Sequence, residues 1–271
     1  MHERNSQWLI PILLVAAAAA ALGYYWLQLN APVPTISVTP AESSPTLKEP
    51  ETTGPRYPLP QKVSGLSDRE NLTPLPPLDQ SDEYFRLDLA RLFGSGMAEL
   101  LADTAVIEKI VATVDNLPRS HVAERIRPIG GIVGPYLVDG QDGSGLSTTN
   151  PANYQRYDFL VSLLANADLV TLVEVYQRFY PLFQEAYAGL GYPQGFFNDR
   201  AVEVIDHLLA TPDVEDPVEL VRPHVLYEYA DPQLEALSSG QKLMLRIGAD
   251  HSVRVKQFLE ELRVLIAVPA T

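Results

Sequence analysis

Apolar residues recur at helical spacing along most of the second half of the chain. The strongest pattern follows Asp168, where apolar and aromatic residues from Leu169 to Leu190 recur in alternating steps of three and four positions down one face. Ser238 and Gln241 form a capping box that opens another helix. Further helices are predicted over residues 82–93, 103–117, 151–165, 197–210 and 252–268. Together these patterns predict a mainly α, helical bundle-like domain over residues 78–268.

Two stretches depart from helical periodicity. Residues 128–150 are rich in glycine, and the apolar run Ile132–Val138 precedes a turn at Asp139-Gly140. This pattern predicts a loop with a short hairpin. Residues 218–229 are extended in character. The domain is therefore expected to hold at most a short β-hairpin beside its helices.

A second kind of apolar pattern lies at the N-terminus. Trp8 to Leu27 is a run of 20 residues without charge, flanked by Trp and Tyr side chains of the kind found at membrane interfaces. As a helix it spans about 30 Å, the thickness of the hydrocarbon core. We predict a transmembrane helix over residues 8–29. The alanine tract 16–21 leaves a cleaved signal peptide as the alternative.

Few charges orient the predicted span. Arg4 and the α-amine precede it, and the first basic residue after it is Lys48. The positive-inside rule places residues 1–7 in the cytoplasm and the rest of the chain across the membrane. In a bacterium this orientation corresponds to the inner membrane, with one pass and a periplasmic C-terminal domain.

The segment between span and domain, residues 30–77, contains 11 of the 23 prolines together with many Ser, Thr and Glu residues. Such a composition buries too little apolar area to offset the entropy lost on ordering, so we predict a disordered, proline-rich linker. In a polyproline II conformation its reach is at most roughly 150 Å.

Charge and cysteine content exclude several classes of function. After residue 77 there are 28 Asp and Glu against 15 Lys and Arg, which argues against nucleic-acid binding. Without cysteine the chain has no disulfide, thiolate nucleophile or Cys-ligated zinc. Lipase, zincin and P-loop motifs are absent as well. We assign no catalytic residue, metal or cofactor.

Three blocks of the sequence resemble a known family. They are NYQRYDFLVSLLANAD (153–168), VYQRFYPLFQEAYAGLGYPQGFFNDRAVEVIDHLLATP (175–212) and VLYEYADPQLEALSSGQKLMLRIG (225–248). These blocks are similar to the bacterial domain-of-unknown-function family number 3014, over roughly residues 75–268. The resemblance implies a membrane segment and a proline-rich region before the domain, and it implies no activity or catalytic residue.

Candidate chemistry is concentrated on the predicted helix 197–210. Asp199, Glu203 and Asp206 share one face, and His207 lies one turn after Glu203. Such a stripe suits a metal or an acid–base site. Arg200, with Arg156 or Arg178 reaching across from neighbouring helices, would instead make it a structural network of Arg–carboxylate bridges.

Tyr and Arg side chains suggest a binding surface, because these residues are enriched at interaction hot spots. The binding candidates are Arg156, Arg178, Tyr180, Asn198, Asp199, Glu203 and His207. The first hypothesis is a non-enzymatic, membrane-anchored envelope protein whose helical domain binds an envelope protein partner. The alternative is an enzyme or binder that acts on envelope glycan through a carboxylate, Tyr and Arg groove.

Overall fold

A computed structural model of the chain describes residues 54–59, 74–130, 134–140 and 146–268. The predicted transmembrane helix 8–29 and most of the predicted linker lie outside the described residues. Among the described helices, none is by itself both long and apolar enough to cross a membrane. The helices Asp158–Ala165 and Leu169–Gly189 are long and apolar enough only when taken together, and the chain bends by 93° between them.

The first helices of the domain begin where the sequence predicts. α2 spans Asp82–Phe93, as predicted, and Gly94 follows its last residue. α4 begins three residues later than predicted, because the Asp82 carboxylate accepts hydrogen bonds from the N–H groups of Ala105 and Val106, both at 2.7 Å. The elements of this part are η1 (Leu78–Gln80), α2 (Asp82–Phe93), α3 (Ser95–Leu100), α4 (Val106–Asn116) and η2 (Glu124–Ile126).

The central helices follow the apolar pattern closely. Asp168 caps the long helix α7 by accepting from the N–H groups of Val170 and Thr171. The single helix predicted over 151–165 is instead two, interrupted at Arg156 and Tyr157. The elements are α5 (Ala152–Gln155), α6 (Asp158–Ala165), α7 (Leu169–Gly189) and α8 (Phe197–Leu209).

The C-terminal helices are α9 (Pro232–Glu235), α10 (Ser239–Arg246) and α11 (Ala249–Ile266). The predicted capping box is present at the start of α10. The Ser238 hydroxyl accepts from the Gln241 N–H, and the Gln241 side chain accepts from the Ser238 N–H. Helix α11 begins at Ala249, three residues before the predicted start.

The prediction of at most a short β-hairpin is wrong. β1 (Val138–Asp139) and β2 (Leu146–Thr149) form the expected hairpin, but β2 also pairs with β3 (Glu219–Val221), which pairs with β4 (Glu228–Tyr229). The result is a four-stranded antiparallel sheet in the order β1-β2-β3-β4. Strands of two to four residues carry too little periodicity to reveal a pairing partner some 70 positions away.

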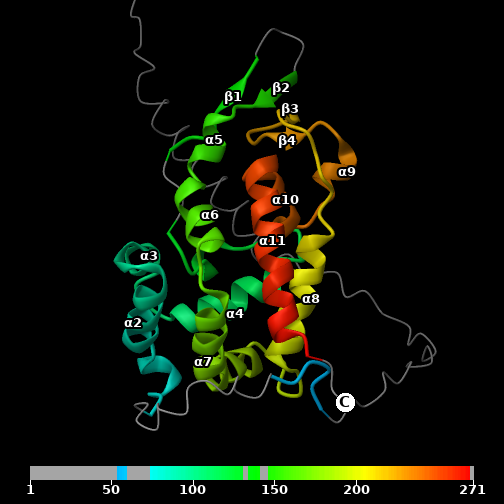
Figure 1. Cartoon of the computed structure of the whole chain (residues 1–271). Coiled ribbons are helices and arrows are strands. Elements are labelled where there is room, and N and C mark those ends of the chain that lie inside the picture. Colours follow the sequence, from blue (N-terminus) through cyan, green and yellow to red (C-terminus); the bar gives the residue numbers. More distant parts are fainter. Residues whose placement is uncertain (1–53, 60–73, 131–133, 141–145, 269–271) are drawn as a thin grey trace, which may run out of the picture. The chain divides into compact units, whose positions relative to one another are not determined.

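The core lies mainly between helices. α7 packs against α4, α8 and α11, and α8 packs against α4 and α11 (Figure 1). Phe179, fully buried on α7, packs with Phe85 of α2 at a ring distance of 5.0 Å. A second cluster joins α7, α8 and the end of α11, and a third lies between the sheet and α10. The second cluster is the floor of the candidate site.

Candidate functional site

A short piece of the predicted linker lies against the helical domain. Residues 54–59, Gly-Pro-Arg-Tyr-Pro-Leu, lie against the N-terminal end of α8, next to the last turn of α11 (Figure 1). Proline has no N–H and restricts the residue before it to extended conformations. The segment between Pro55 and Pro58 therefore offers two adjacent main-chain donors, the N–H groups of Arg56 and Tyr57.

One carboxylate accepts both donors. Oδ2 of Asp199 is 2.9 Å from the Arg56 nitrogen, and Oδ1 is 2.8 Å from the Tyr57 nitrogen. Asp199 lies in the first turn of α8, where the partial positive charge of the helix N-terminus stabilises an anion. Hydrogen bonds to an ionised acceptor are stronger than neutral ones. Asp199 therefore binds the main chain of the segment, whatever its side chains.

The neighbouring residue, Asn198, binds the same segment from its carbonyl side. Its side-chain NH₂ donates to the carbonyl oxygens of Tyr57 (2.8 Å) and Ile266 (3.0 Å), and its Oδ1 accepts from the Tyr176 hydroxyl at 3.0 Å. Only 1% of Asn198 is exposed. Both donors and one acceptor of this buried amide are used, so its burial costs little free energy. Asn198 thereby joins α7, α8, α11 and the segment.

The side chain of Tyr57 packs on an apolar floor. The buried residues of that floor are Val173, Val202, Ile205 and Ile266. Removing an aromatic ring from water is favourable at about 25 cal/mol per Å² of apolar area. Burial of the ring therefore favours binding of the segment.

Arg56 makes the ionic contact of the segment. Its guanidinium is 3.4 Å from Glu203, which also lies 3.6 Å from Arg200. The Arg56 side chain is 61% exposed, so this pair contributes little to stability, on the order of 0–1 kcal/mol. It favours a basic residue at this position. We call Asn198, Asp199 and Glu203, with the apolar floor under Tyr57, the α8 peptide site.

The arginines that were candidates for the α8 stripe bind different partners. Arg200 binds the buried Asp115 of α4, with Nε 3.0 Å from the carboxylate. Arg178, considered as a bridge to the α8 stripe, binds Asp88 of α2 instead. Arg156 donates to the carbonyl oxygens of Gly134 and Pro135. The expectation that Arg156 or Arg178 reaches the α8 carboxylates is therefore wrong.

The remaining candidates lie beside the site or away from it. Burial raises the pKa of Tyr180, and its hydroxyl donates to Gln184 at 3.1 Å. Tyr180 packs edge-on against Tyr176 and so supports the start of α8. His207 lies near the other end of α8, where Nε2 is 2.7 Å from the Ser238 hydroxyl. The structure thus brings Asn198, Asp199 and Glu203 together and leaves Arg156, Arg178 and His207 outside.

The α8 carboxylates do not form a metal or acid–base cluster. Asp206 pairs with Arg263 of α11, while Asp199 and Glu203 bind the segment. Within the described parts of the chain, no group of three or more His, Cys, Asp or Glu residues is arranged to hold a metal ion.

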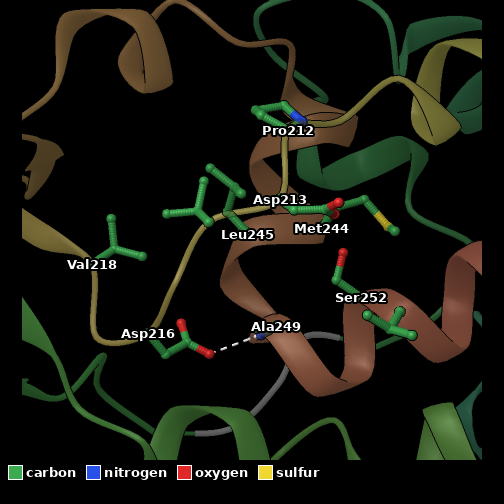
Figure 2. A pocket seen from close by; sticks show the side chains of 10 residues that line it. Pro212, Asp213, Asp216, Val218, Met244, Leu245, Ala249 and Ser252 are labelled. Carbon is green, nitrogen blue, oxygen red and sulfur yellow. Dashed lines mark hydrogen bonds between the residues drawn. The ribbon is translucent and has the colours of Figure 1, made fainter.

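A small cavity of about 70 Å³ lies between the loop after α8 and the helices α10 and α11 (Figure 2). Its Asp216 accepts from the Ala249 N–H at 2.8 Å and from the Tyr154 hydroxyl at 2.7 Å. Asp213, at its rim, pairs with Lys256. Ligand pockets for small molecules usually have volumes of about 300–1,000 Å³, so this cavity is a weaker candidate than the α8 peptide site.

Sequence reasoning missed Arg56 and Tyr57. The signal was present, because Tyr57 is the single aromatic residue within 30–77. An aromatic residue between two prolines in an otherwise polar linker is a candidate anchor. Residues 54–59 therefore differ from the disorder expected of the whole linker, since Tyr57 can bury its ring.

Comparison with known proteins gives one match. The family described as "Protein of unknown function (DUF3014)" matches residues 106–263, from the first residue of α4 to the last turn of α11. The matched range contains α8 and does not contain residues 54–59. No curated protein and no solved structure matches the chain.

Proposed function

The chain belongs to the DUF3014 family, and from this premise we propose that its helical domain is a non-enzymatic interaction domain presented by a single-pass membrane anchor. The α8 peptide site carries the proposal. Asp199 and Asn198 bind two main-chain donors and one main-chain acceptor of residues 54–59. One recurring mode of peptide recognition likewise combines main-chain hydrogen bonds, which give affinity, with surfaces that select side chains.

The proposed location is a bacterial inner membrane, with the domain in the periplasm and another envelope protein as its partner. It rests on the apolar run within residues 8–29, on Arg4 before that run, and on the absence of basic residues between the run and Lys48. The acidic balance of the domain disfavours an anionic bilayer surface as its ligand.

The glycan alternative gains no support from the described residues. Acid–base cleavage of a glycan needs two carboxylates that face one groove with room for the substrate between them. Asp199 is occupied by main-chain N–H groups, and Asp206 is paired with Arg263. The function that we propose is therefore that of an interaction domain.

In-cell cross-linking tests the proposal. A photo-reactive amino acid in place of Glu203, in the full-length chain, is expected to capture the same envelope protein in repeated experiments. The additional substitution Asp199→Ala is expected to abolish the capture, because it removes the side-chain carboxylate that accepts from the main-chain N–H groups of the ligand. As a matched control, the same amino acid replaces Asp213, an acidic residue with 86% side-chain exposure in the loop that follows the C-terminal end of α8, whereas Asp199 lies in the first turn of that helix.

The control position is expected not to capture that protein. Identical captures from both positions, or cross-links from position 203 that reach only residues 54–59 of the same chain, would contradict an interaction domain that uses this site.

A further inference from the structure

Resting on the proposed function, we propose that residues 54–59 are an internal ligand of the α8 peptide site. The ligand of this site is then a short peptide with a basic residue followed by an aromatic residue between two prolines, and its main chain bends at the basic and the aromatic residue. A partner protein with such a segment would displace the chain's own segment and take its place. The main-chain groups, the basic residue and the aromatic residue of this ligand class each correspond to a contact in the structure.

The main chain of the ligand is recognised by three hydrogen bonds. Two N–H groups bind Asp199 at 2.9 and 2.8 Å, and one carbonyl oxygen binds Asn198 at 2.8 Å. Because both N–H groups donate to one carboxylate, the main chain of the ligand must bend at these two residues, as it does at Arg56 and Tyr57. The prolines on either side restrict the main chain before binding, which reduces the entropy lost on binding.

The side chains of the ligand are selected by two different surfaces. An aromatic ring fits where Tyr57 covers the buried residues Val202 and Ile266. A basic group fits beside Glu203, 3.4 Å from the Arg56 guanidinium. Most of the basic side chain stays in solvent, so Lys is expected to replace Arg with a small loss.

Because the chain's own segment occupies the α8 peptide site, binding of an added ligand to the wild-type chain is hard to detect. Residues 60–73 connect the segment to the domain, and a short connection of this kind gives a local ligand concentration in the millimolar range or above. A free peptide competes poorly against such a tethered ligand. An added ligand is therefore expected to bind strongly only when the internal ligand is weakened.

The experiment uses the purified full-length chain and a fluorescent peptide of residues 52–60, TTGPRYPLP. Binding is measured by fluorescence anisotropy. The Tyr57→Ala chain, which keeps an intact site but has a weakened internal ligand, is expected to bind the peptide at least tenfold more tightly than the wild-type chain. Asp213→Ala, added to the Tyr57→Ala chain, removes one exposed carboxylate elsewhere and is expected to change the affinity by less than twofold.

Two changes separate main-chain recognition from simple burial of the ring. Asp199→Ala in the Tyr57→Ala chain is expected to reduce peptide affinity at least tenfold. A peptide that is N-methylated at the positions of Arg56 and Tyr57 keeps both side chains but loses both N–H donors. It is expected not to bind, and it tests the site without any substitution that could affect folding.

Three results would overturn the proposal. One is equal binding of the methylated and the unmodified peptide. Another is no binding of the unmodified peptide to the Tyr57→Ala chain at millimolar concentration, which makes residues 54–59 a structural part of the fold only. The third is a dimeric wild-type chain that becomes monomeric on Asp199→Ala, which assigns the site to a second copy. Failure of the envelope cross-link at position 203 would instead reject the proposed function.

Discussion

Asn198 and His207 lie on the same helix, but their side chains differ in burial and in hydrogen-bond partners. Asn198 is almost fully buried and satisfied by Tyr57, Tyr176 and Ile266. Loss of its side chain would leave buried polar groups without partners, each at a cost of about 1–3 kcal/mol. His207 is only partly buried, and its contact is a single hydroxyl.

His207 gives the chain a pH dependence with a defined sign. Desolvation by burial, together with the nearby charge of Arg200, lowers the pKa of His207 below its usual 6.5. The unfolded chain takes up this proton near pH 6.5, before the folded chain does. The contribution of His207 to the free energy of unfolding is therefore fully present above about pH 7. It is lost as the pH falls through 6.5 toward the lowered pKa.

We expect the unfolding free energy of the wild type to fall more between pH 7.5 and 5.5 than that of His207→Gln. Urea titrations of both proteins at each pH measure the difference, and the subtraction cancels the contributions of the other histidines. A difference that stays constant with pH would mean that His207 has the same pKa in the folded and unfolded chains.

At the element scale, helix ends are held by residues distant in sequence. Asp82 accepts from the first N–H groups of α4, and Asn198 donates to the last carbonyl of α11. Two glycines mark the junctions α2–α3 and α10–α11. Gly94 has φ 86° and ψ 168°, and Gly248 has φ 88° and ψ 158°, a region that other residues rarely adopt. Their surroundings differ.

The two glycines form a matched pair for substitution. A Cβ at Gly94 would have no atom within 4 Å, whereas a Cβ at Gly248 would lie 2.7 Å from the ring of Tyr154. Gly94→Ala is expected to lower the free energy of unfolding by about 1–3 kcal/mol from backbone strain alone. Gly248→Ala is expected to cost roughly 1–3 kcal/mol more, because the ring must move.

Equilibrium urea unfolding measures both effects. In a Tyr154→Ala background the excess cost of Gly248→Ala is expected to disappear, as a double-mutant cycle would show. Equal costs for the two glycines in the wild-type background would show that the Tyr154 ring moves aside freely.

At the scale of the whole molecule, binding of residues 54–59 divides the linker. Between the proposed span and the bound segment there are residues 30–53, with a polyproline reach of at most about 75 Å. Release of the segment extends the limit to roughly 150 Å, set by residues 30–77. If the internal ligand is displaced as proposed, partner binding and tether length are coupled.

The proposed orientation gives a prediction at the same scale. A reporter enzyme that is active only outside the cytoplasm, fused after Thr271 of the full chain, is expected to be active. Deletion of residues 8–29 is expected to abolish that activity, because the chain would lose its membrane span. Activity of a cytoplasm-specific reporter at the same position would contradict the orientation.

The helices were predictable from the sequence because their signals are local. The cap at Asp168, the capping box at Ser238, and three- and four-residue apolar spacing all act within one or two turns. The family was predictable as well, and the match over residues 106–263 confirms it. The candidate site was predictable in part, because Asn198, Asp199 and Glu203 were selected from one helix.

Contacts between distant residues had to come from the tertiary structure. The sheet depends on pairing of Ser147 with Leu220, and the partners of Asp199 lie more than 140 positions earlier in the chain. The sequence by itself determined the helices, the acidic balance and the apolar run at the N-terminus, since these follow from local composition and spacing. Only the tertiary structure decided that the carboxylate of Asp199 binds main-chain N–H groups, because its partners come together only when the chain folds.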